Sequence, residues 1–67
     1  MKYHYFVYFS LPKQEGSLDE HNNEVIIDSP INHFEAINQI QRMLAEMYKV
    51  DYVILRNYQL LRTEEEV

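Results

Sequence analysis

The segment that most constrains the fold of this chain is its aromatic N-terminal stretch, Tyr3-His4-Tyr5-Phe6-Val7-Tyr8-Phe9. Five of these seven residues are aromatic, and this composition favours a β-strand. Successive side chains of a strand point to opposite faces, so the stretch divides into two sets: Tyr3, Tyr5, Val7 and Phe9 on one face, and His4, Phe6 and Tyr8 on the other. Both faces are apolar and need cover. A chain of 67 residues can hardly supply two covering layers, which points to a partner.

The length and the composition also point to association. A domain of this size buries only about 60% of its unfolded surface, so disulfides, a metal or oligomerisation usually supplement it. The sequence has no cysteine, which excludes disulfides and thiolate metal sites. The histidines, at positions 4, 21 and 33, match no common ligand spacing, and the one local cluster, Asp19-Glu20-His21, is expected in a loop. We therefore expect a homo-oligomer, most simply a dimer, with no metal and no cofactor.

The charge and the termini narrow the class of protein further. A net charge of -5 argues against binding to double-stranded DNA, because such proteins carry a basic stripe. No apolar run is long enough to cross a membrane, and Met1-Lys2 leads directly into the strand-like stretch without a cleavage site. Together with the absence of cysteine, these features lead us to expect a cytoplasmic protein.

The hydrophobic pattern predicts three strands and one helix. In chain order we expect a strand over 2–11, a polar loop over 12–23, a short strand over 24–28, a helix to about Lys49, and a strand from Tyr52 that continues to Leu61. Asn57 is a poor strand former, which indicates a bend or bulge near it. Residues 1–61 form a single domain in this interpretation, and 62–67 a frayed acidic tail.

The helix carries a start signal and a core stripe. Asn32 followed by Glu35 has the spacing of a capping box, with Ile31 before it. Apolar residues then recur every three or four positions, which predicts one buried face: Phe34, Ile37, Ile40, Leu44 and Met47.

The element order β-β-α-β limits the topology. The first two strands pair as an antiparallel hairpin, and a right-handed crossover through the helix returns the third strand beside the first. The prediction is an α+β fold, a three-stranded antiparallel or mixed sheet of order 2-1-3 with the helix on one face. The sequence leaves open which aromatic face the helix covers. The other face would be an exposed apolar patch, typical of an interface. The candidate binding residues are His4, Phe6, Tyr8, Arg56 and Tyr58.

The residues give no sign of catalysis. Ser10, Ser17 and Ser29 lie at strand ends or in loops, outside any nucleophile-elbow context. The single glycine cannot build a phosphate-binding loop. We therefore expect a protein that is not an enzyme. Exposed aromatic residues on a sheet could instead stack the bases of a single-stranded nucleic acid, although the acidic net charge favours packing or dimerisation.

Four segments resemble a family of small uncharacterised proteins from phages and prophages of Gram-positive bacteria. They are Tyr5-Phe6-Val7-Tyr8-Phe9, Asn22-Asn23-Glu24-Val25-Ile26, the helix entry from Pro30 to Ile37, and the stretch from Val53 to Leu61. The resemblance spans most of the chain and carries no catalytic residues.

The resemblance implies a setting among the accessory genes of mobile elements. Small proteins of that setting often bind a host component, and some block antiviral defence systems or sequester nucleotide signals. The expected function is therefore a non-enzymatic phage protein that inhibits or sequesters a host protein in the bacterial cytoplasm. One alternative is a nucleotide-signal sponge with a pocket between subunits. The other is a single-stranded nucleic-acid binder.

Overall fold

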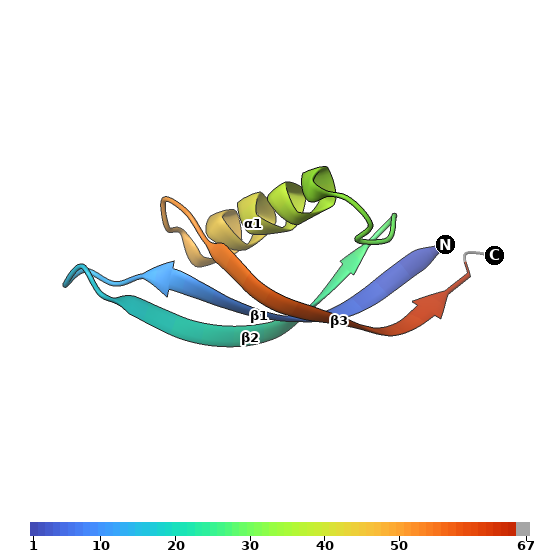
Figure 1. Ribbon diagram of the computed structural model, residues 1–67, viewed down its shortest axis with the longest axis horizontal. Coiled ribbons are helices and arrows are strands. Elements are labelled where there is room, and N and C mark those ends of the chain that lie inside the picture. Colours follow the sequence, from blue (N-terminus) through green and yellow to red (C-terminus); the bar gives the residue numbers. More distant parts are fainter. Residues whose placement is uncertain (66–67) are drawn as a thin grey trace.

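The structure, a computed structural model, describes residues 1–65 as three strands and one helix (Figure 1). These are β1 (Lys2–Pro12), β2 (Leu18–Ile27), α1 (Phe34–Tyr48) and β3 (Ile54–Glu64). The strands form one sheet of order β2-β1-β3, and β1 pairs antiparallel with both neighbours. The predicted α+β class, the β-β-α-β order and the strand order 2-1-3 are confirmed, and the sheet is wholly antiparallel.

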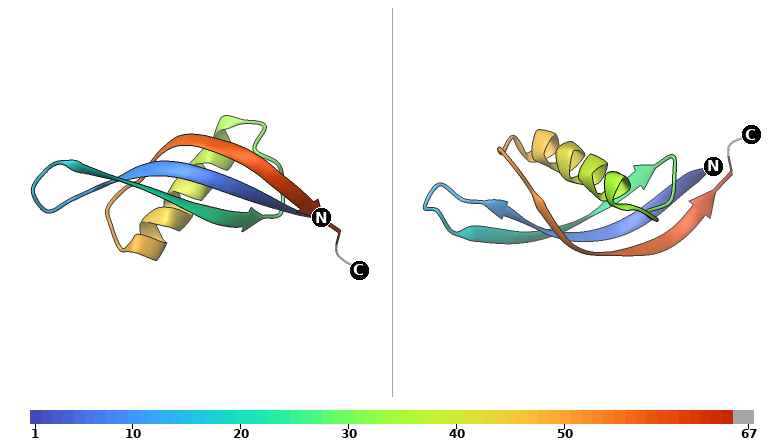
Figure 2. Two further views of the ribbon diagram at one scale, coloured as in Figure 1. Left: turned by 90° about the horizontal axis from the view of Figure 1, so that it is seen from below. Right: turned by 45° about the horizontal axis from the view of Figure 1, so that its top comes forward.

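The central strand β1 supplies most of the core. Its alternate residues Tyr5, Val7, Phe9 and Leu11 are buried together with Ala36, Ile40 and Leu44 of the helix. Helix α1 crosses this face diagonally, and the strands curve around it, so that the other face of the sheet is convex (Figure 2). The face with Tyr5, Val7 and Phe9 is therefore the covered one, which the sequence had left open.

The buried stripe of α1 differs from the predicted one at both ends. Ile40 and Leu44 are fully buried and Ile37 is half-buried, as expected. Phe34, however, is 71% exposed and Met47 is 54% exposed, so the prediction was wrong for these two residues. Phe34 lies six residues before Ile40, which turns it about 120° away from the sheet at 3.6 residues per turn. Met47 lies in the last turn, where its sulfur contacts the Asn23 amide of the edge strand β2.

The helix begins one residue later than its capping pattern suggests. The N-cap is His33, whose Nδ1 accepts the Ala36 N–H at 3.2 Å, so the predicted Asn32 cap is wrong. The imidazole offers the same acceptor that an asparagine oxygen would, one position further along. At the other end, Lys49 takes the left-handed conformation, with φ 58°, that ends helices.

The hairpin loop is much shorter than predicted. Strand β2 begins at Leu18, so residues 18–23 of the expected loop 12–23 belong to a strand, and the connection is only 13–17. A turn closes it: the Lys13 N–H donates to the Ser17 carbonyl, and Gly16 has φ 83°, which favours glycine. Residues 18–23 form a strand because β1 supplies their pairing partners, from Val7↔Asn23 to Pro12↔Leu18.

Strand β3 is displaced toward the C-terminus relative to the prediction. It begins at Ile54 rather than Tyr52 and continues to Glu64, where it pairs with Lys2. The prediction of a frayed tail is therefore wrong for residues 62–64, which belong to β3. Residues 66–67 lie outside the described residues. The register against β1 shifts twice, which leaves Arg56 and Leu61 as the extra residues of two bulges. The irregularity predicted near Asn57 is confirmed, one residue earlier.

Candidate functional site: the open face of the sheet

The face of the sheet turned away from α1 is called here the open face. Residues paired directly across antiparallel strands share a face, so the register of β1 with its neighbours defines its members. They are Lys2, His4, Phe6, Tyr8, Ser10 and Pro12 of β1; Leu18, Glu20, Asn22, Glu24 and Ile26 of β2; and Ile54, Arg56, Asn57, Gln59, Arg62 and Glu64 of β3.

An aromatic centre lies on the open face. Phe6 is 39% exposed and Tyr8 is half-buried, and no helix or strand within residues 1–65 covers them. On either side of these two rings, His4 and Ser10 are almost fully buried. Polar side chains from the two edge strands bend over the ends of β1 and cover them. The polar groups at the two ends of the open face are thus hydrogen-bonded within the chain, whereas the apolar middle of the face is exposed.

His4 is bound on both sides by carboxylates of the edge strands. Its Nδ1 lies 3.0 Å from Glu24 Oε2, and its Nε2 lies 3.0 Å from Glu64 Oε1. An ionised carboxylate only accepts hydrogen bonds, so both contacts form together when both ring nitrogens carry a proton. His4 therefore ties β2 and β3 to the central strand at this end of the sheet.

The opposite end of the open face has its own polar contacts. Arg56 Nε donates to Ser10 Oγ at 3.0 Å, from the bulge in β3. On the other side, the Glu20 carboxylate accepts from the Tyr8 hydroxyl and raises the pKa of Tyr8 above its usual value. Partial burial acts in the same direction, whereas the positive charge of Arg56 acts against it. Tyr8 thus keeps its proton and its neutral, amphipathic surface.

Charge is distributed unevenly across the open face. The β2 side carries two carboxylates, Glu20 and Glu24, and the β3 side carries two guanidinium groups, Arg56 and Arg62. Glu64 follows at the end of β3, where it is paired with His4. An acidic edge and a basic edge therefore flank the aromatic centre.

A hollow of about 320 Å³ opens beside the aromatic centre. Its lining is Phe6, Tyr8, Asn57, Tyr58 and Gln59. Of the five candidate binding residues, His4, Phe6, Tyr8 and Arg56 lie together on the open face. The ring of Tyr58 instead packs edge-on against Tyr5, 6.0 Å between centroids, on the side of the sheet that faces α1.

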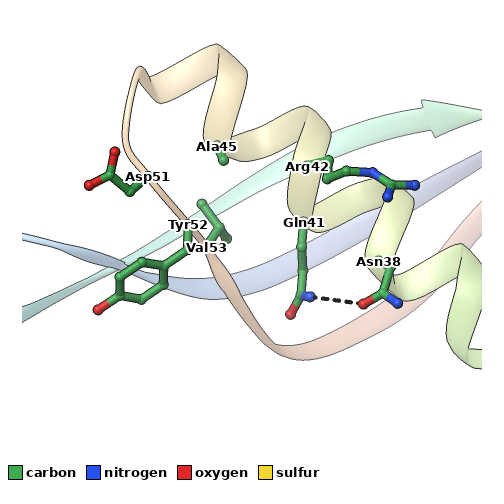
Figure 3. A pocket seen from close by; sticks show the side chains of 7 residues that line it. All are labelled: Asn38, Gln41, Arg42, Ala45, Asp51, Tyr52 and Val53. Carbon is green, nitrogen blue, oxygen red and sulfur yellow. Dashed lines mark hydrogen bonds between the residues drawn. The ribbon is translucent and has the colours of Figure 1, made fainter.

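A second cavity, of about 250 Å³, lies between α1 and the segment before β3 (Figure 3). Its lining includes Tyr52, Arg42, Gln41 and Asn38. The polar groups in it are partly committed to the fold: Gln41 accepts the Leu55 N–H at 2.9 Å, and its amide donates to Asn38. Gln41 thus aligns the first residues of β3, a role that no pattern in the sequence indicates.

In the Asp19-Glu20-His21 cluster near the hairpin, Asp19 forms ion pairs with neighbouring side chains. Asp19 Oδ2 lies 2.7 Å from His21 Nε2, and Lys13 Nζ lies 3.6 Å from Asp19 Oδ1. These contacts lower the pKa of Asp19, the hydrogen bond from His21 being the largest cause.

Within residues 1–65, no group of three or more histidines or carboxylates is placed to hold a metal ion. The one helix in that range is too short and too polar to span a bilayer.

Comparison with known proteins does not assign the chain to a family. No protein-family model, no curated protein and no solved structure matches the chain. Only the residues and the geometry of the open face therefore bear on the function of this chain.

Proposed function

We propose that this chain is a non-enzymatic binding protein and that the open face is its association surface. The observation that carries the proposal is the position of Phe6 and Tyr8, in the middle of the central strand and uncovered by any other element of the described chain. A contiguous apolar patch in such a place is typical of a surface that binds another molecule. The satisfied polar groups at His4 and Ser10 frame the patch, as a polar rim frames an interface.

The resemblance to small phage and prophage proteins extends the proposal. In that setting the associated protein would bind a host component in the bacterial cytoplasm and inhibit or sequester it. A small, acidic chain with an uncovered apolar face fits such a role. The phage origin and the host target depend on the resemblance alone.

Matched substitutions on opposite sides of the molecule test the proposal. Phe6→Glu places a carboxylate in the aromatic centre, whereas Phe34→Glu places one on the exposed start of α1, where the wild-type ring is 71% exposed. We expect immobilised wild type and Phe34→Glu to retain the same protein from a bacterial lysate, and Phe6→Glu to lose it. Far-UV circular dichroism is the check that both variants fold. Equal capture by Phe6→Glu would show that the open face is not the association surface.

The aromatic centre also resembles a base-stacking surface, but its surroundings do not favour nucleic acid. Glu20 and Glu24 lie on the same face, and Glu64 lies at its end. Carboxylates repel the phosphates that supply most of the affinity for a nucleic-acid strand. A fluorescence-anisotropy titration with a single-stranded oligonucleotide, repeated in high salt, tests this: salt-sensitive binding at micromolar protein would favour the nucleic-acid function instead.

The hollow on the open face favours a second candidate function, a sponge for a nucleotide signal. Its volume, about 320 Å³, lies at the lower end of cavities that hold small ligands. Aromatic rings could stack a base, and the amides of Asn57 and Gln59 could bind its polar edge. A thermal-shift screen with cyclic and linear nucleotides, with Gln59→Ala as the matched variant, measures this. The absence of any shift at millimolar nucleotide would exclude the sponge.

A further inference from the structure

We infer that the molecule covering the open face is a second copy of this chain, related to the first by a two-fold axis parallel to β1. The inference rests on the proposed function, since it names the partner of the same surface. The distribution of charge across the sheet leads to both the identity of the partner and the direction of the axis.

The two edges of the open face are complementary to each other. Glu20 and Glu24 lie on β2, and Arg56 and Arg62 lie on β3, on opposite sides of the aromatic centre. A rotation about an axis along β1 exchanges the two sides, so the acidic edge of each copy faces the basic edge of the other. Arg62 pairs with His4 and Glu24 with Phe6, two residues apart along β1. That offset is about 7 Å at the rise of a strand, within reach of an arginine side chain.

The other in-plane axis gives the opposite electrostatic result. A two-fold axis perpendicular to the strands lays β2 on β2 and β3 on β3. Glu20 and Glu24 would then face the same carboxylates of the second copy, and Arg56 and Arg62 would mainly face guanidinium groups. Like charges placed opposite one another disfavour an interface, so the charges of the two edge strands favour the axis parallel to β1, although this axis also brings the Lys2 residues of the two copies near each other at the end of β1.

The same axis joins the two aromatic centres. Residues on β1 lie near the axis, so Phe6 and Tyr8 meet Phe6 and Tyr8 of the second copy, as an isologous interface requires. Two sheets that pack face to face keep their strands within about 30° of each other. The product is a four-layer dimer with the sheets inside and the helices outside. Phe34 and the cavity beside Tyr52 remain on the outer surface, available to another partner.

The area of the open face determines how tightly the two copies are expected to bind each other. Three strands of 10 or 11 residues cover roughly 35 Å by 14 Å, which is about 500 Å² for each copy if the sheet is treated as a flat rectangle. The total for two copies, about 1,000 Å², lies below the roughly 1,200–2,000 Å² of stable specific interfaces and in the range of weak or transient ones. The convex shape of the sheet reduces the contact further (Figure 1). We therefore expect a dissociation constant in the micromolar range.

Complementary charge reversals test the arrangement directly. Sedimentation velocity from about 1 to 500 μM should show the wild-type chain dimerising, and Glu24→Arg and Arg62→Glu should each dimerise at least tenfold more weakly. In a mixed dimer of the two variants, one edge contact carries both reversals and the other keeps the wild-type charges, so each contact again joins opposite charges and the dimer should return. The pair Glu20→Arg and Arg56→Glu offers an independent repetition if either first variant unfolds. Phe34→Glu serves as the control and should dimerise like the wild type.

The inference would be overturned by a monomeric wild type at 500 μM, by variants that dimerise as well as the wild type, or by a mixture that fails to restore the dimer. Co-sedimenting nucleic acid would identify another occupant. A dimer that survives Phe6→Glu would indicate pairing through the β3 edge instead.

The inference and the proposed function fail in different ways. A monomeric protein whose capture from lysate is lost in Phe6→Glu would contradict the dimer and support the binding function. A Phe6-dependent dimer that captures nothing would support the dimer and contradict host binding.

Discussion

The hydroxyl of Tyr5, on the central strand, accepts the backbone N–H of Ile31 at 2.9 Å in the buried core. This bond links β1 to the connection that leads into α1, twenty-six residues further along the chain. It joins the packing of Tyr5, Val7 and Phe9 against the helix in holding α1 over the covered face.

Tyr5→Phe should therefore destabilise the fold although it removes only one oxygen atom. The Ile31 N–H would be left buried without an acceptor, which costs about 1–3 kcal/mol. Urea denaturation measures the loss. Tyr52→Phe is the matched control, because Tyr52 is 49% exposed and its change should stay within about 0.5 kcal/mol. Equal stabilities for the two variants would mean that the Tyr5 bond contributes nothing.

The His4–Glu64 contact should hold the end of β3 locally rather than stabilise the whole fold. Glu64 is 60% exposed, so solvent screening reduces the gain from the pair to less than about 1 kcal/mol. Glu64→Ala should nevertheless open the pairing of 62–64 with β1, which amide hydrogen exchange would detect as faster exchange at those residues. Glu65→Ala, one residue beyond β3, provides the control. Unchanged exchange in Glu64→Ala would assign the order of this segment to the backbone ladder alone.

The sequence predicted the parts of this molecule that depend on local pattern and on general rules of topology. The period of two in β1 assigned His4, Phe6 and Tyr8 to one face, and the right-handed crossover placed β1 at the centre. What it missed depends on pairing between distant segments. Residues 18–23 lack the alternation of apolar and polar side chains that signals a strand, and they form one only because they pair with β1. The closure of Glu24 and Glu64 over His4 likewise requires the register of both edge strands, including a bulge in β3.

Core substitutions in α1 should follow the observed stripe and not the predicted one. Leu44 is fully buried, so Leu44→Ala should cost about 2–5 kcal/mol, a large part of the stability of so small a domain. Ile40→Val is a milder test and should cost about 0.5–1.5 kcal/mol. Met47→Ala should cost clearly less than Leu44→Ala, because Met47 is 54% exposed. Chemical denaturation of the three variants gives the ranking, and a loss at Met47 equal to that at Leu44 would contradict it.

The Asp19–His21 pair predicts a component of acid sensitivity. His21 lowers the pKa of Asp19 below its usual 3.8, with Lys13 acting in the same direction. A carboxyl group with a lowered folded-state pKa stabilises the fold at pH values above 3.8, and this contribution is lost as the pH falls through the folded-state pKa. His21→Phe removes the donor but can keep the stacking on Phe9, so it should raise the pKa of Asp19 toward 3.8. Carboxyl-carbon NMR titration measures that pKa. Lys13→Gln should raise it less, and an unchanged titration in His21→Phe would assign the shift to other groups.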